Sequence, residues 1–129
     1  MDRDFGGPKN DILRWLAAAR DPAVGSALAS MHREPSPAWT VAELAKHAGV
    51  SRTVFAGRLV EVLGQTPLAY LGRWRLQLGA RRLQSSDDTV LEVALGVGYE
   101  SEAAFNRAFK REFELPPAQY RKRERDRAR

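Results

Sequence analysis

The chain has 129 residues, 43% of them hydrophobic and 29% charged, which suits one compact domain or two small subdomains that share a connecting element. It has no cysteine and only two histidines, and this excludes disulfides, thiolate catalysis and a zinc site. Its net charge of +5 and isoelectric point near 10.1 favour an anionic partner such as nucleic acid. Because the start has no signal segment and no apolar run approaches the ~18 residues of a membrane span, we expect a cytoplasmic chain that contacts no membrane.

The beginning of the chain predicts a tail followed by one helix. Residues 1–20 contain a polar stretch with glycine and proline and then ILRWLAAAR, which is typical of a tail or a leftover linker helix. Asp21 followed by Pro22 predicts an N-cap and a first helical residue. The helix that they open continues through VGSALASMHR, whose large apolar residues share one face.

A short helix, a corner and a second helix follow. Thr40 and Glu43 are spaced as a capping box, in which each side chain accepts a hydrogen bond from the other residue's backbone N–H. This spacing predicts a helix over residues 41–48. Gly49 supplies the left-handed backbone of the corner, and Ser51 caps the next helix.

A long helix is predicted from Pro67 to Gln84. Its leucines fall on two faces, Leu71 and Leu78 on one, and Leu68, Leu76 and Leu83 on the other. A helix that is apolar on two sides is a central one. At 1.5 Å per residue it spans ~27 Å, which is comparable with the ~34 Å between major grooves on one face of a duplex.

The pattern of short helix, corner and long helix occurs twice. Thr40 and Glu43 recur 49 residues later as Thr89 and Glu92, and one extra residue in the second turn then makes the offset 50. The further matching pairs are Ala45 and Ala94, Gly49 and Gly98, Ser51 and Ser101, Phe55 and Phe105, Pro67 and Pro117, and Tyr70 and Tyr120. Two helices joined by a glycine turn form a helix-turn-helix, whose second helix enters a major groove. A plain αα corner in a bundle is the alternative for one copy, and two copies on a basic chain favour the helix-turn-helix.

These stretches resemble the DNA-binding half of the AraC/XylS transcriptional regulators. The resemblance covers about residues 21–123 and lies in WTVAELAKHAGVSRTVF, in GQTPLAYLGRWRL and above all in VGYESEAAFNRAFKREFELPPAQYR. It implies an all-α fold of two helix-turn-helix subdomains joined by a long central helix. The implied parts are a first subdomain with the connecting helix at 21–84, a second subdomain at 85–123 and a basic tail at 124–129.

The resemblance also implies a function. It predicts sequence-specific binding of double-stranded DNA, with two recognition helices in successive major grooves, and contact with RNA polymerase, commonly as an activator. Family members usually carry a separate effector or dimerisation domain, and we expect none within this sequence. We therefore expect a monomer in this form.

Three positions depart from the family pattern. Glu114 stands where glycine is usual, which predicts either a longer last recognition helix or a helix end that costs about 1 kcal/mol in strain. Gly96 replaces the more usual alanine, and Gly57 lies where arginine is common. The first helix of the second copy is expected to end at Gly98.

The outward face of each second helix is identified by an inward-facing aromatic, because at about 100° per residue a position two residues further on points away from it. Beside Phe105 this face holds Ala103, Asn106, Arg107 and Lys110. We predict that Arg107 reads guanine with two hydrogen bonds, that Asn106 pairs with adenine or a phosphate, and that Lys110 meets the DNA backbone. Ser101 begins this helix, where free amides favour a phosphate, although capping alone explains the serine.

The same face of the first copy carries small side chains. It holds Thr53, Ala56, Gly57 and Val60, with Arg52 at its edge and Ser51 at the helix start. No long polar side chain points outward from its centre, so we predict weak base discrimination there. Thr53 or Ala56 is expected to contact a thymine methyl, and Arg52 a phosphate. Sequence choice should therefore be dominated by the second copy.

An enzyme is the function that the sequence favours least. The glycines at 96–98 approach a dinucleotide fingerprint but follow no strand, and His47 near Ser51 has no nucleophile elbow, so we predict no cofactor and no catalytic residue. The competing hypothesis is a helical protein-interaction module that kept the scaffold and lost DNA binding, which the bare face around Gly57 favours.

Overall fold

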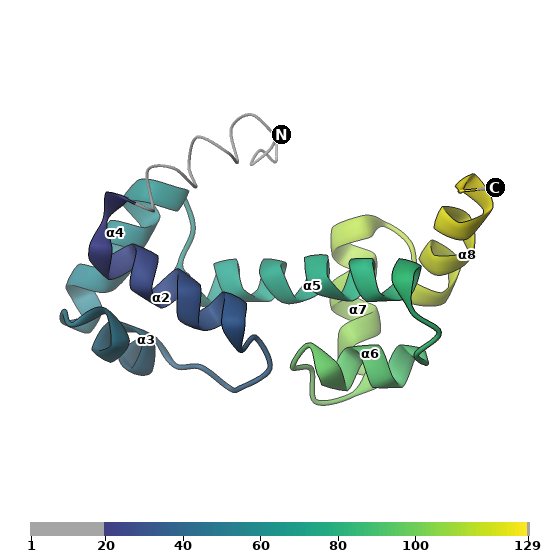
Figure 1. The fold of residues 1–129 in the computed structure, drawn as a ribbon, viewed down its shortest axis with the longest axis horizontal. Helices are drawn as coiled ribbons and strands as arrows, with labels where there is room; N and C mark the ends of the chain where they lie inside the picture. The colour runs from purple at the N-terminus through teal and green to yellow at the C-terminus, as the bar shows by residue number, and fades with distance from the viewer. Residues whose placement is uncertain (1–19, 129) are drawn as a thin grey trace. The chain divides into compact units, whose positions relative to one another are not determined.

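The structure is a computed structural model that describes residues 20–128, and this part of the chain forms seven α-helices and no strand (Figure 1). The helices are α2 (Pro22–Arg33), α3 (Val41–Ala48), α4 (Arg52–Leu63), α5 (Pro67–Ser85), α6 (Val90–Gly96), α7 (Glu102–Phe113) and α8 (Pro117–Arg127). The all-α prediction with a long central helix is confirmed. The linker helix expected within residues 1–20 lies almost wholly outside the described residues.

The described residues divide into two compact units. The first contains the residues up to Glu34 together with Trp39–Tyr70, and the second contains Pro35–Ala38 and the chain from Leu71 onward. The division therefore falls inside α5, whereas the expected boundary followed residue 84. Most of α5 belongs to the second unit because its buried side chains pack with the helices that come after it.

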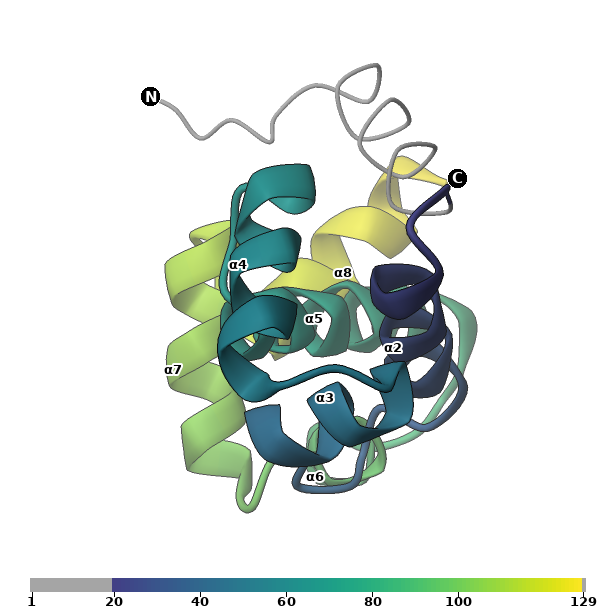
Figure 2. The same cartoon turned by 90° about the vertical axis from the view of Figure 1, so that its left-hand side faces the viewer.

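The first unit is built from α2, α3 and α4, which Figure 2 shows from the side of this unit. Asp21 caps α2 as predicted, since its carboxylate accepts hydrogen bonds from the N–H groups of Ala23 and Val24 at 3.0 and 3.3 Å. The apolar face of α2 is buried and includes Val24, Leu28 and Met31. α2 packs mainly against α3, and the two helices support α4.

The corner between α3 and α4 has the predicted chemistry. Thr40 and Glu43 form the capping box, with N–H to side-chain oxygen distances of 3.0 and 3.1 Å. Gly49 has a left-handed backbone, with φ of 76°, and its N–H donates to the carbonyl of Lys46. Ser51 Oγ then accepts from the N–H of Val54 at 3.2 Å.

The second corner repeats these hydrogen bonds. Thr89 and Glu92 form a capping box at 2.8 and 3.0 Å, and Ser101 caps α7. The N–H of Gly98 donates to the carbonyl of Leu95, three residues earlier, as the N–H of Gly49 does to Lys46 in the first corner. α6 itself ends at Gly96, two residues before the predicted end, because Val97 turns into the core while Gly98 takes a φ of 106°.

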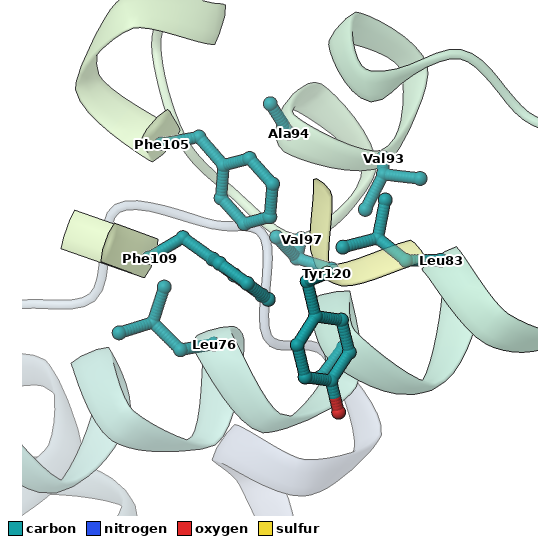
Figure 3. Close-up of a cluster of buried hydrophobic side chains, with 9 residues drawn as sticks. Leu76, Leu83, Val93, Ala94, Val97, Phe105, Phe109 and Tyr120 are labelled. Carbon is teal, nitrogen blue, oxygen red and sulfur yellow. The ribbon is translucent and has the colours of Figure 1, made fainter. Parts of the chain in front are cut away.

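The core of the second unit gathers on one side of α5 (Figure 3). Its buried members are Leu76, Ala80, Leu83, Val93, Ala94, Val97, Phe105, Phe109 and Tyr120. The ring of Phe105 lies directly over Gly79, where an added Cβ would stand 2.8 Å from the ring carbon Cζ. The prediction of two apolar faces on α5 is only partly confirmed, since Leu68 is 48% exposed and Leu78 is partly buried.

A segment from the loop between α2 and α3 is anchored in the second unit. Arg75 on α5 donates from Nε to the carbonyl of Pro35 at 2.8 Å and from Nη2 to the carbonyl of Pro37 at 2.7 Å. Gly98 lies against the same place, because a Cβ on it would stand 2.8 Å from Arg75 Nε and 3.0 Å from Ser36 Cα. The turn of the second helix-turn-helix therefore requires glycine for space as well as for backbone conformation.

The C-terminal helix extends further than predicted. α8 continues to Arg127, so residues 124–127 are its last turn and not a tail. Arg121 donates to the carbonyls of Leu83 and Ser86, and Arg125 donates to Ser86 and pairs with Asp87 at 3.2 Å. These contacts hold the basic helix against the end of α5.

Glu114 ends α7 in a left-handed conformation with φ of 66°. The corresponding residue in the first copy is Gly64, with φ of 74°. Of the two outcomes predicted for Glu114, the strained helix end is therefore confirmed and the longer helix is wrong.

We expect Glu114→Gly to raise the free energy of unfolding by about 1 kcal/mol. The left-handed backbone conformation destabilises a non-glycine residue by about that amount relative to glycine. Thermal or urea unfolding followed by circular dichroism measures the change. The matched variant Glu112→Gly, which places glycine inside α7, should instead destabilise the protein. A Glu114→Gly protein no more stable than the parent would contradict this account of the helix end.

Candidate nucleic-acid interface

The rotation of α7 is fixed by its aromatic residues. Phe105 and Phe109 are fully buried, and they make edge-to-face contacts with the rings of Tyr99 and Tyr120, respectively, and a tilted contact with each other. The opposite side of the helix therefore faces away from the core. On that side Ala103, Arg107 and Lys110 are all exposed, as the sequence predicted.

Asn106 differs from its predicted placement. Its side chain is half-buried, and its Oδ1 is buried without a hydrogen-bond partner. Two-bond recognition of adenine needs both the amide oxygen and the amide nitrogen. The position one residue after Phe105 lies at the edge of the outward face, about 100° from the core direction, and this explains the burial. The structure therefore does not bring the Asn106 oxygen to the same surface as Arg107.

Arg111 is a residue of this face that the sequence reasoning missed. It is exposed and lies one turn beyond Arg107 on α7. The signal for it in the sequence is its spacing of four residues from Arg107, because residues four apart on a helix lie on the same face. The neighbouring residue Glu112 forms an ion pair with Arg73 on α5, with 3.0 Å between the nitrogen and the oxygen, and this pair lies within the second unit.

Tyr99 packs beside the start of α7 and is also close to Arg111. Its ring lies 5.3 Å from that of Phe105 in an edge-to-face arrangement. Burial raises the pKa of Tyr99, while the neighbouring cations Arg75 and Arg111 act in the opposite direction. Tyr99 is therefore an uncharged side chain that packs the turn against α7.

The outward face of α4 is open, and between Arg52 at the helix start and Glu61 near the helix end it carries only small or apolar side chains. Phe55 and Leu59 are fully buried and fix the rotation of α4. The predicted residues on the other side are exposed at Arg52, Thr53 and Gly57 and half-buried at Ala56. No atom lies within 4 Å of a Cβ placed on Gly57, so the surface there is bare backbone.

The two faces differ in charge at equivalent positions. The three cations of α7 are Arg107, Lys110 and Arg111, and the residues fifty positions earlier on α4 are Gly57, Val60 and Glu61. This difference in charge lies on exposed surface, because all of these α4 positions are solvent-accessible. Ser51 and Ser101, which begin the two recognition helices, both cap them, and capping alone accounts for a serine at these positions.

Comparison with known proteins identifies the fold. A helix-turn-helix domain family matches residues 44–123. The solved DNA-binding domain of AdpA, a global transcriptional factor in complex with a target DNA, is 32% identical, and the alignment covers 83% of this chain and 96% of that one with a TM-score of 0.76. The chain belongs to the AraC family of transcriptional regulators.

Curated relatives of this AraC-family chain are also named as regulators. A putative AraC-like transcription regulator of Streptomyces lividans is 49% identical over 111 residues, which are 86% of this chain and 36% of that protein. The regulatory protein SoxS of Salmonella typhimurium is 34% identical over 80 residues, 62% of this chain and 75% of the relative. The chain spans little more than a third of the length of the first curated relatives that it matches.

The family and the fold are those of transcription regulators and not of enzymes. Across residues 20–128, no helix is both long and apolar enough to cross a membrane. The same residues contain no group of three or more histidine and acidic side chains able to hold a metal ion.

Proposed function

We propose that this AraC-family chain binds a bipartite site on double-stranded DNA, with α4 and α7 in successive major grooves, and so regulates transcription. The observation that carries the proposal is the cationic face of α7, where exposed Arg107, Lys110 and Arg111 stand opposite the buried Phe105 and Phe109. A rigid helix that presents guanidinium and ammonium groups outward suits both guanine edges and phosphates. The net charge of +5 favours the same partner.

Within this function, Arg107 is the base-reading residue and Lys110 and Arg111 are backbone contacts. Arg107 lies nearest the centre of the outward face, where a groove-bound helix meets base edges. Lys110 and Arg111 lie later on the helix, closer to where the phosphate ridge passes. On α4, Arg52 is the corresponding phosphate contact.

The regulator acts on RNA polymerase as an activator in the cytoplasm, and this chain is a monomer unless a further domain pairs it. One curated relative, RclR of Escherichia coli K12, is named an HTH-type transcriptional activator and is 42% identical over 94% of this chain. The alternative is an interaction module without DNA affinity. The bare face of α4 favours that alternative, and the cations of α7 favour DNA.

Salt dependence separates the two functions. For a DNA binder, the logarithm of the association constant should fall linearly with the logarithm of salt, by about 0.9 for each phosphate neutralised. We expect Lys110→Gln to reduce that slope by about 0.9 and to weaken binding to all duplexes alike.

The matched control is Lys122→Gln on α8, which removes an exposed lysine that lies outside the proposed interface. It should leave the slope unchanged. Fluorescence anisotropy with a labelled duplex measures both variants. Undetectable binding, or an affinity that does not change with salt, would contradict the DNA-binding function.

A further inference from the structure

The outward face of α4 carries a narrow apolar stripe. Val60 is 45% exposed, Thr53 is exposed, and Ala56 is half-buried between them. These three positions point the same way on the helix, since they fall within about 60° of one another. Each presents a methyl group, and none has a long hydrogen-bonding side chain.

Gly57 makes the stripe approachable. The residue lies in the middle of α4 on the exposed side, and nothing lies within 4 Å of the point where its Cβ would be. The equivalent position on α7 holds the long side chain of Arg107. A surface that enters against α4 can therefore come closer to the helix backbone than against α7.

The folded unit does not need the stripe. The side of α4 that packs in the first unit holds Phe55, Leu59 and Leu63, which are all buried. In the repeat, the position of Val60 is taken by Lys110, so the fold accepts a charged residue there. The apolar character of the exposed side of α4 is a property that the helix-turn-helix does not require.

Only one base offers an apolar group in the major groove. Thymine carries a C5-methyl there, whereas guanine, cytosine and adenine present hydrogen-bonding groups. Of the three side chains of the stripe, only Thr53 has a group that can form a hydrogen bond. We propose that α4 selects its half-site by contacts of Val60, Ala56 and Thr53 with thymine methyl groups. The proposal rests on the proposed DNA binding and names the chemistry that the first helix-turn-helix recognises.

DNA suits the stripe better than a protein partner because of its surroundings. The stripe follows directly from the helix start at Ser51, and exposed Arg52 stands beside it in position for a phosphate. The other exposed valine of α4, Val54, lies about 130° from the centre of the stripe and does not widen it into a patch. Three small side chains match the size of a few methyl groups in a groove.

The test replaces thymine by deoxyuridine, which removes the methyl and leaves base pairing intact. A high-affinity duplex is first selected from random sequences with the chain, and the half-site whose base preference survives Arg107→Ala is assigned to α4. Deoxyuridine at contacted thymines of that half-site should weaken binding about fourfold for each methyl, as for the loss of one buried methyl-sized group. Deoxyuridine at thymines outside the selected site should have no effect.

A pair of variants assigns the contact to the stripe. Val60→Ala should remove the sensitivity to deoxyuridine at the thymine that Val60 contacts, whereas Val54→Ala, with a similar exposure of 43%, should retain it. Thermal unfolding by circular dichroism shows that both variants are folded. If the duplex binds tightly and deoxyuridine in the α4 half-site changes nothing, or if Val54→Ala abolishes the effect as well, the methyl contacts are overturned while DNA binding stands. If no duplex is selected at all, the proposed function itself fails.

Discussion

Gly98→Ala should lower the free energy of unfolding by roughly 2–5 kcal/mol. Gly98 has a φ of 106°, which alanine adopts only with strain. A Cβ would also meet Arg75 Nε at 2.8 Å and the backbone of Ser36 at 3.0 Å, and the backbone cannot move aside as a flexible side chain can. Urea unfolding followed by circular dichroism measures the loss.

Two other glycines serve as controls. Gly49→Ala introduces only backbone strain, because φ is 76° and nothing lies within 4 Å of the added atom, so about 1–2 kcal/mol should be lost. Gly57→Ala lies inside α4 with open space around it and should stabilise the protein by about 0.5–1 kcal/mol. Equal losses for Gly98→Ala and Gly49→Ala would show that the packing of Gly98 against Arg75 and Ser36 contributes nothing.

Arg107→Ala should weaken binding to a selected duplex by about 1–3 kcal/mol and relax the base preference at one or two positions. The reason is the two-bond contact that a guanidinium makes with guanine, from an exposed position at the centre of the outward face. Selection from random duplexes, repeated with the variant, measures both effects.

Thr53→Ala is the comparison on the first recognition helix and should have a smaller effect, since it removes a short side chain from a face with no long polar group. The opposite ranking of the two variants would refute the dominance of α7. A loss that is uniform across all duplexes would identify Arg107 as a phosphate contact and not a base-reading residue.

The helix boundaries could be predicted from the sequence because caps are local chemistry. The hydrogen bonds of Thr40 with Glu43 link residues three apart, and those of Ser51 and Gly49 reach no further than four. The residue types and spacings in the sequence therefore contain all that these bonds require. The rotation of the recognition helices was also predictable, because Phe55 and Phe105 occupy equivalent positions in the two copies and helical periodicity gives the direction of the other side chains relative to them.

Features that depend on distant contacts could not be predicted. The C-terminal helix extends to Arg127 where its arginines bond carbonyls near Ser86, which is 35 and 39 residues away in sequence. The burial of the Asn106 oxygen and the exposure of Leu68 likewise depend on which neighbours pack beside them. Helical periodicity gives the direction of a side chain and does not identify its neighbours.

Methylation interference on the selected duplex tests the central claim most directly. Dimethyl sulfate modifies guanine N7, which faces the major groove, so a methylated guanine that blocks binding marks a base approached by a recognition helix. On a selected duplex that carries guanines in both half-sites, two clusters of interfering positions should appear about one helical turn, ~10 bp, apart, and Arg107→Ala should remove the stronger cluster alone. A single cluster, clusters on opposite faces of the duplex, or no interference at all would contradict recognition by two helix-turn-helix units.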